Sequence, residues 1–121
     1  MHPRFEAHDE SFAKVVGGAP LLVKVVDVDA HEGPVYVASE DALYVTTVPR
    51  TIDVPLAGSR HVAVKRIALD GDRFPVVPER VGVVRAPANN ANGTAHGHDG
   101  PLLVCEQGSV GENGAIARLD P

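Results

Sequence analysis

The sequence predicts an all-β protein, and three observations lead to that prediction. Short segments rich in Val, Leu and Ile alternate with turns built from Gly, Pro, Asp and Asn. No segment keeps a 3.6-residue apolar periodicity, so we expect almost no helix. One layout occurs twice, with Glu32-Gly33 and Asn92-Gly93 standing 60 positions apart and an apolar hairpin partner following each. Such strands are typical of a sandwich, a barrel or the blades of a propeller.

Composition sets the class of protein and excludes several functions. The 121 residues suffice for one domain with a core, and 44% apolar and 22% charged residues are ordinary for a soluble globular chain. A net charge of −5 with scattered Lys and Arg argues against a nucleic-acid surface. The N-terminus lacks a signal core and no run is long enough to span a membrane, so we expect a cytoplasmic protein. A single cysteine, Cys105, excludes an internal disulfide, and we expect it buried in an apolar strand.

In the first half of the chain, the signals alternate between strands and breakers. Residues 5–7 and 12–16 are short strands or an irregular lead, and Gly-Gly-Ala-Pro at 17–20 ends them. Residues 21–28, rich in Leu and Val, are a strand, and residues 29–34 a turn. A hairpin follows, with arms at 35–39 and 43–48.

The second half continues the pattern. Two prolines make residues 49–59 a loop, and residues 61–69 form a long strand that Asp70-Gly71-Asp72 ends. Two prolines reduce residues 74–85 to an interrupted edge strand. After a loop at 86–90 come a short strand, a His-Asp-Gly turn, an apolar strand at 102–105, and a last short strand at 115–119.

Three polar groups are candidates for chemistry. Glu32 at a strand entrance is either an oxygen ligand for a hard cation or a turn carboxylate facing water. Asn92 can reach a ligand or metal, yet Asn before Gly is also common in turns. Residues 96–98, His-Gly-His, together with Glu106 suggest zinc, but seven residues separate His98 from Glu106, and solvated imidazoles are the better account.

Four stretches resemble the gluconolactonase, senescence-marker-protein (regucalcin) and luciferin-regenerating-enzyme family. They are His-Glu-Gly-Pro-Val-Tyr-Val at 31–37, Leu-Tyr-Val-Thr-Thr-Val-Pro at 43–49, Ala-Asn-Gly-Thr at 91–94 and Leu-Leu-Val-Cys-Glu-Gln-Gly at 102–108. The family fold is a six-bladed β-propeller with a divalent cation in its channel, and its members hydrolyse sugar lactones and related esters. The resemblance implies residues 21–28 as a strand of the last blade, 35–85 as blade one and 92–121 as an incomplete blade two.

The resemblance also implies site residues. Glu32 would be a ligand of the cation, which is calcium or else zinc, magnesium or manganese. Asn92 would line both the cation and the substrate site. Asn90 would lie at the substrate, where some members have an Arg, so no Arg contact is expected. Thr47 and Gly97 stand where the family often has Asp.

Length limits what the resemblance implies. Six blades of roughly 45 residues need about 270 residues. A later Asn ligand and a later Asp, which is also the proposed general base, have no counterpart here. We therefore expect the N-terminal portion of a metal-dependent sugar-lactone hydrolase, without catalytic residues and inactive alone. The alternatives are a non-catalytic β module or a non-functional remnant. Open strand edges are expected to recruit other chains.

Overall fold

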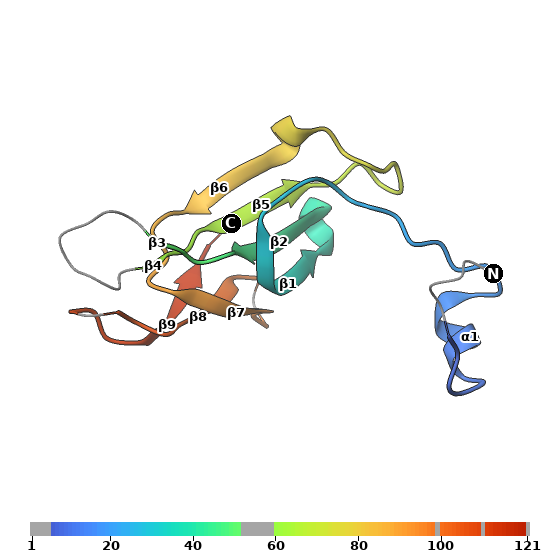
Figure 1. The fold of residues 1–121 in the computed structure, drawn as a ribbon, viewed down its shortest axis with the longest axis horizontal. Helices are drawn as coiled ribbons and strands as arrows, with labels where there is room; N and C mark the ends of the chain where they lie inside the picture. The colour runs from blue at the N-terminus through green and yellow to red at the C-terminus, as the bar shows by residue number, and fades with distance from the viewer. Residues whose placement is uncertain (1–5, 52–59, 99, 110, 121) are drawn as a thin grey trace.

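The computed structural model describes residues 6–51, 60–98, 100–109 and 111–120 (Figure 1). Within these ranges the chain forms one short helix, nine strands and two 3-10 turns, η1 (Ala38–Glu40) and η2 (Pro78–Arg80). The helix and strands are, in order, α1 (Phe12–Val16), β1 (Ala30–Val37), β2 (Ala42–Thr47), β3 (Arg50–Thr51), β4 (Arg60–His61), β5 (Val64–Ala68), β6 (Val81–Arg85), β7 (Ala91–His96), β8 (Leu102–Glu106) and β9 (Ala115–Leu119).

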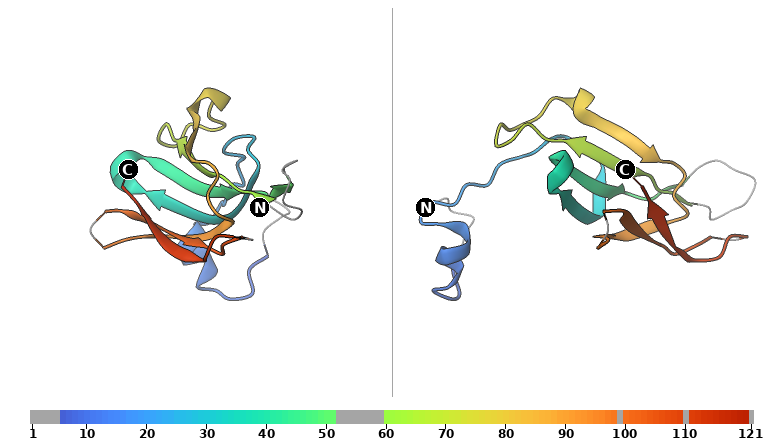
Figure 2. Two further views of the ribbon diagram at one scale, coloured as in Figure 1. Left: turned by 90° about the vertical axis from the view of Figure 1, so that its left-hand side faces the viewer. Right: turned by 180° about the vertical axis from the view of Figure 1, so that it is seen from behind.

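The strands form two antiparallel sheets in which neighbours in the chain are neighbours in space. The first sheet has the order β1-β2-β5-β6 and the second the order β7-β8-β9, while β3 and β4 form a small separate ladder. The prediction of an all-β protein is confirmed. Turned views show the two sheets packed against each other, with β1 and β7 at their contact (Figure 2).

The core has two parts, one on each face of the first sheet. Strand β2 supplies both, because successive side chains of a strand point to opposite faces. Tyr44 belongs to the cluster between the two sheets, and Val45 belongs to the cluster on the far face. The first cluster also holds Val37, Ala42, Val62, Val64, Ala88, Ala91, Leu102 and Val104, and the second Val26, Ile67 and Val76.

The layout that recurs in the sequence is a repeat of structure. Val48 N donates to the carbonyl of Asp29 at 2.8 Å, and Gly108 N donates to the carbonyl of Asn89 at 3.2 Å. Both partners of the second bond stand 60 positions after those of the first. The ladders β1-β2 and β7-β8 also share an irregular register around Gly33 and around residues 91–94. Residues 30–47 and 90–107 are therefore equivalent hairpins.

The first correction concerns residues 12–16, which form helix α1 rather than a strand. Asp9 Oδ1 accepts a hydrogen bond from Ser11 N at 2.7 Å, just before the helix. Gly17, with φ at 77°, ends it and donates to the carbonyl of Ala13. These local bonds decide the conformation of a segment too short for periodicity to show.

Residues 21–28, predicted as a strand, are not paired in a ladder in the part of the chain that the structure describes. Val26 is buried on the far face of the first sheet, and the carbonyl of Val25 accepts a bond from Val76 N at 2.8 Å. The segment is extended, but it has no ladder among the described residues. Strand propensity reports a fit to a pleated, half-buried surface, so it does not by itself supply the partner.

Two strand boundaries also differ from the prediction, and backbone hydrogen bonding explains both differences. Strand β1 begins at Ala30, inside the turn predicted at 29–34, because a bulge at Gly33, where φ is 61°, keeps the strand paired. The strand predicted at 61–69 is broken at Val62 and Ala63, whose backbone groups bond to Ala88 and Thr47 instead. The loop predicted at 49–59 contains the short β3, and its residues 52–59 lie outside the described part.

The second half follows the prediction more closely. Strand β9 spans the residues predicted, β8 extends one residue further, and β6 is an edge strand shortened by the prolines before it. The expected burial of Cys105 is wrong. Its side chain is exposed, because alternation along β8 sends Val104 to the core and Cys105 to the other face.

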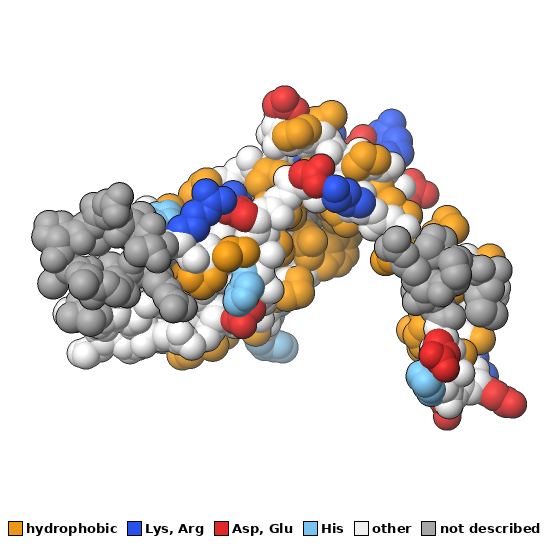
Figure 3. Space-filling view, in the orientation of Figure 1, with side chains coloured by type: hydrophobic (Ala, Val, Ile, Leu, Met, Phe, Trp, Pro, Cys, Tyr) orange, Lys and Arg blue, Asp and Glu red, His pale blue; other side chains and the backbone are white. Residues whose placement is uncertain are grey.

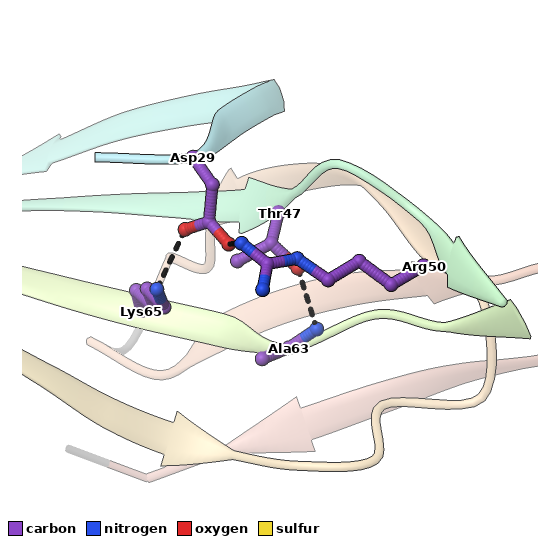
Figure 4. A network of polar contacts seen from close by, with 5 residues as sticks. All are labelled: Asp29, Thr47, Arg50, Ala63 and Lys65. Atoms are coloured by element: carbon purple, nitrogen blue, oxygen red, sulfur yellow. Dashed lines mark hydrogen bonds and ion pairs between the residues drawn. The ribbon is translucent and has the colours of Figure 1, made fainter. Parts of the chain in front are cut away.

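Two carboxylates tie the first sheet together. Asp29 accepts hydrogen bonds from Lys65 Nζ at 2.6 Å and Arg50 Nη2 at 2.9 Å at the entrance of β1 (Figure 4). Glu40 accepts one from Tyr44 Oη at 2.7 Å and one from Arg66 Nε at 2.9 Å. The bond from Lys65 lowers the pKa of Asp29, and the bond from Tyr44, followed by that from Arg66, lowers the pKa of Glu40.

These shifts predict that the fold loses stability in acid. A carboxylate with a lowered pKa in the folded state stabilises it above the ordinary pKa, about 4, and that contribution disappears as pH falls through the folded-state value. The melting temperature should therefore be flat near neutral pH and fall below about pH 4.5. Thermal melts from pH 7 to pH 3 measure this. In Asp29→Asn the drop should be smaller, and an unchanged melting temperature at pH 3 in the parent chain would contradict the assignment.

Candidate functional site

A pocket of about 390 Å³ opens where the first residues of β1 and β7 meet. The hairpins of both repeats contribute to it, together with the residues that follow β2 and β8. Its lining consists of His31, Glu32, Pro49, Val62, Asn90, Ala91, Asn92 and Gln107. The structure thus brings together the three residues that the resemblance implies as site residues, Glu32, Asn90 and Asn92. The histidines at 96 and 98 and Glu106 do not line this pocket.

Backbone contacts hold β1 and β7 side by side at the pocket. Thr46 of β2 is fully buried, and its hydroxyl lies 2.9 Å from the carbonyl oxygen of Glu32 and 3.0 Å from that of Asn92. The Thr94 hydroxyl donates to the carbonyl of Gly33. One threonine hydroxyl therefore links the backbones of the two leading candidates, which lie 60 residues apart.

Gly33 is required by this close approach. A Cβ at position 33 would lie 2.5 Å from the carbonyl oxygen of Asn92 and 2.9 Å from Thr94 N, both backbone atoms. Its φ of 61° lies in the left-handed region that favours glycine. The Gly of the Glu-Gly-Pro motif is thus the place where the two strands touch.

The polar side chains around the pocket differ in how far hydrogen bonds to the protein already engage them. Glu32 is 48% exposed, and its Oε1 lies 3.9 Å from His31 Nδ1. Asn92 Oδ1 accepts a hydrogen bond from Gly93 N at 2.6 Å. Part of the role of this residue is therefore the turn role that the sequence suggested. Asn90 has φ at 56° and donates from Nδ2 to the carbonyl of Gly108 at 2.8 Å. The Glu32 carboxylate is therefore the negative group available to a ligand.

A second polar group, formed by Glu106 with Arg85 and Asn89, was not predicted as a group from the sequence. Glu106 is buried, and its Oε1 lies 2.8 Å from Arg85 Nη1, without hydrogen-bond geometry. Asn89 Nδ2 donates to Glu106 Oε2 at 3.4 Å and to the carbonyl of Asn113 at 3.1 Å. This arrangement neutralises a buried carboxylate that would otherwise be costly. Gln107 was missed too, although its place 60 positions after Thr47 puts it at an equivalent strand end.

The oxygen atoms that the pocket residues offer are of the kind that a hard cation prefers, but they are too few to complete its coordination shell. Glu32, Asn90, Asn92 and Gln107 offer carboxylate and amide oxygens, which calcium and magnesium prefer. Calcium takes six to eight oxygens, and the described residues contain no group of three or more His, Cys, Asp and Glu side chains able to hold a metal. The His96 and Glu106 pair suggested by the sequence is separated, since β7 and β8 pair His96 with Leu102 and Ala91 with Glu106 at opposite ends of the ladder.

Replacing Thr46 by valine should destabilise the pocket while keeping side-chain shape. The change removes the buried hydroxyl that lies against two part-buried backbone carbonyls, which costs about 1–3 kcal/mol of unfolding free energy. Urea denaturation measures the loss. Thr46→Ser is the matched control: it keeps the hydroxyl and loses a methyl group, so it should retain most of the polar contribution. Equal stability of the parent and Thr46→Val would show that the hydroxyl does not link the strands.

Comparisons with known proteins identify no relative. No family model, curated protein or solved structure matches the chain. In the part of the chain that the structure describes, no helix is both long and apolar enough to cross a membrane.

Proposed function

We propose that this chain carries part of the cation and substrate site of a metal-dependent sugar-lactone hydrolase resembling the gluconolactonases. One observation supports the proposal above the others. Glu32 and Asn92, which the resemblance implies as metal and substrate residues, line a single pocket although they stand 60 residues apart. Asn90, expected at the substrate, lines the same pocket.

The two sheets would be neighbouring blades of a β-propeller. In support, the first sheet is a four-stranded meander, the second is a three-stranded meander, and each begins at the strand that contacts the other sheet. Radial repetition of such four-stranded sheets around a channel defines a propeller. Strands β1 and β7 would then be the inner strands, and the pocket would face the channel.

The cation, calcium or else magnesium, manganese or zinc, would supply Lewis-acid polarisation of a lactone carbonyl when bound. Glu32 would hold it by a charged oxygen, and Asn92 would contribute an amide oxygen next to it. Asn90 and Gln107 carry amide groups that suit the hydroxyl groups of a sugar lactone, since an amide both donates and accepts hydrogen bonds. Pro49, Val62 and Ala91 supply the apolar part of the wall.

The lining residues include one carboxylate, Glu32, and this residue is assigned to the cation. A second carboxylate that could act as general base is not among them. The proposed activity of this chain by itself is therefore binding, and hydrolysis would need a base from outside the described pocket. A non-catalytic module that binds a cation and a sugar through the same pocket is the second candidate, and the absence of such a base among the lining residues favours it.

Calorimetric titration of the purified chain tests the proposal. Calcium, magnesium, manganese and zinc are titrated separately, and an aldonolactone is then titrated with and without the tightest cation. We expect weak cation binding, in the range of about 10⁻⁴–10⁻³ M, because the shell is incomplete. Lactone binding should improve when the cation is present. No heat with any of the four cations would overturn the proposal, and hydrolysis of the lactone would exclude the non-catalytic candidate.

A further inference from the structure

The outer edge of β9 is open. Strand β9 is the last strand of the second sheet, and within the described residues nothing pairs with its free side. In the repeat, β9 takes the place of β5. Strand β2 pairs Ala42 with Ala68 of β5, and β8 pairs Leu102 with Leu119 of β9, each strand in its equivalent register. The free edge of β9 therefore corresponds to the edge of β5 that β6 covers.

The chain holds a segment that is equivalent to β6 but pairs with no strand among the residues that the structure describes. The 60-residue repeat, fixed by the equivalent bonds at Asp29 and Asn89, places residues 21–25 where β6 (Val81–Arg85) lies. Its sequence is Leu-Leu-Val-Lys-Val, which suits a strand. Leu21 is 80% exposed, Leu22 55% and Val23 47%, so this apolar surface is in water in the single chain.

One copy cannot join these two edges. The residues that follow the segment pack on the far face of the first sheet, where Val26 joins Val45 and Ile67. The second sheet covers the opposite face. Figure 1 shows the extended segment leaving the body on the side away from β9, toward the separate helix α1. In the space-filling view, a part of the chain likewise stands apart from the body (Figure 3). The donor segment and the acceptor edge of one chain therefore lie on opposite sides of the first sheet.

We propose that residues 21–24 of one copy of this chain, which are exposed, pair with the free edge of β9 of a second copy as its fourth strand. The ladder of β5 and β6 gives the register, since Val64 pairs with Arg85, Lys65 with Val83 and Arg66 with Gly82. Transferred to the new pair, it sets Val23 opposite Ile116 and Leu22 opposite Ala117. Lys24 takes the bulged position that Val84 has in β6.

The pairing explains the exposed apolar groups on both partners. Ile116 of β9 is 66% exposed, and the proposed register sets it against Val23. Both edges gain backbone hydrogen bonds, which an unpaired strand edge leaves to water. Donor and acceptor are different surfaces, so the contact is head-to-tail and repeats from copy to copy, closing into a ring if the rotation allows. None of this depends on a cation or on the pocket.

Cysteine cross-linking of the full chain tests the register. In a Cys105→Ala background, Val23→Cys and Ile116→Cys place two thiols directly opposite each other across the proposed ladder, at a separation that a disulfide can span. Oxidation should give covalent dimers and larger species on denaturing gels. Val23→Cys with Ala117→Cys is the matched control. Ala117 points to the other face of the sheet, so cross-linking should fall at least tenfold.

Mass measurement by light scattering after size exclusion completes the test. The parent chain should elute as an oligomer, and Val23→Pro should elute as a monomer, because proline removes a donor from the strand. Val23→Thr keeps that donor and should stay oligomeric. A monomeric parent chain would overturn the proposal. An oligomer that cross-links equally well in the control pair would overturn it as well, since association would then use other surfaces.

Discussion

Replacing Gly33 by alanine should cost about 3 kcal/mol or more of unfolding free energy. The new Cβ would lie 2.5 Å from the carbonyl oxygen of Asn92, closer than a carbon can come. A left-handed φ adds about 1 kcal/mol of strain for any residue with a Cβ. The obstacle is backbone and cannot turn aside, so β1 and β7 must separate.

Two other glycines separate the contributions. Gly71 has nearly the same φ, 58°, but a Cβ there meets nothing within 4 Å. Gly71→Ala should therefore show the strain alone, about 1 kcal/mol. Gly18 has neither a positive φ nor a close neighbour, and Gly18→Ala should stay within about 0.5 kcal/mol of the parent. Urea denaturation of the three variants gives the comparison. Equal losses at Gly33 and Gly71 would show that the strands do not meet at Gly33.

Replacing Glu32 by glutamine should weaken cation binding at least tenfold, which corresponds to about 1.4 kcal/mol. The substitution keeps the shape of the side chain and removes the one charge among the carboxylate and amide groups of the pocket. Folding should change little, because the carboxylate is half exposed and its close polar neighbour is His31 at 3.9 Å. Titration with calcium and a thermal melt of the same sample measure both effects.

Glu79→Gln is the control for net charge. Glu79 is exposed on η2 and does not line the pocket, so its loss changes the charge of the chain by the same amount. Affinity in this variant should stay within about twofold of the parent. If both variants bind the cation as the parent does, Glu32 is not a ligand. If both weaken it equally, binding reflects the general field of an acidic protein.

Local signals predicted the hairpins of the second half well. Strands β8 and β9 are bounded by Gly, Pro and Asn turns, and these residues punctuate the chain whatever the tertiary context. The same signals failed at residues 21–28, where composition suits a strand but no ladder forms among the described residues. They failed also at Cys105, because alternation decides which face a side chain takes and a one-residue step reverses it.

Some of the residues at the pocket could be predicted from the sequence and others could not, and the difference has a physical reason. Glu32 and Asn92 are visible because polar residues beside Gly at a strand entrance mark sites that a backbone approaches closely. Asn90 has no such neighbour, and only the family resemblance points to it. Thr46 and Gln107 have no such mark. Their importance comes from pairing across strands, with Thr46 reaching the backbone of both β1 and β7. Comparing the two repeats position by position would have pointed to Gln107.

Because each wall of the pocket belongs to a different sheet, occupancy and folding are thermodynamically linked. A ligand that touches both Glu32 and Asn92 binds only when the sheets are docked, so it shifts the docking equilibrium by mass action. At a hundredfold excess over its dissociation constant, the ligand would contribute about 2.7 kcal/mol to that docking. Amide hydrogens of β1 and β7 would then exchange more slowly with solvent, while those of β6, which contributes no residue to the lining, would keep their rates.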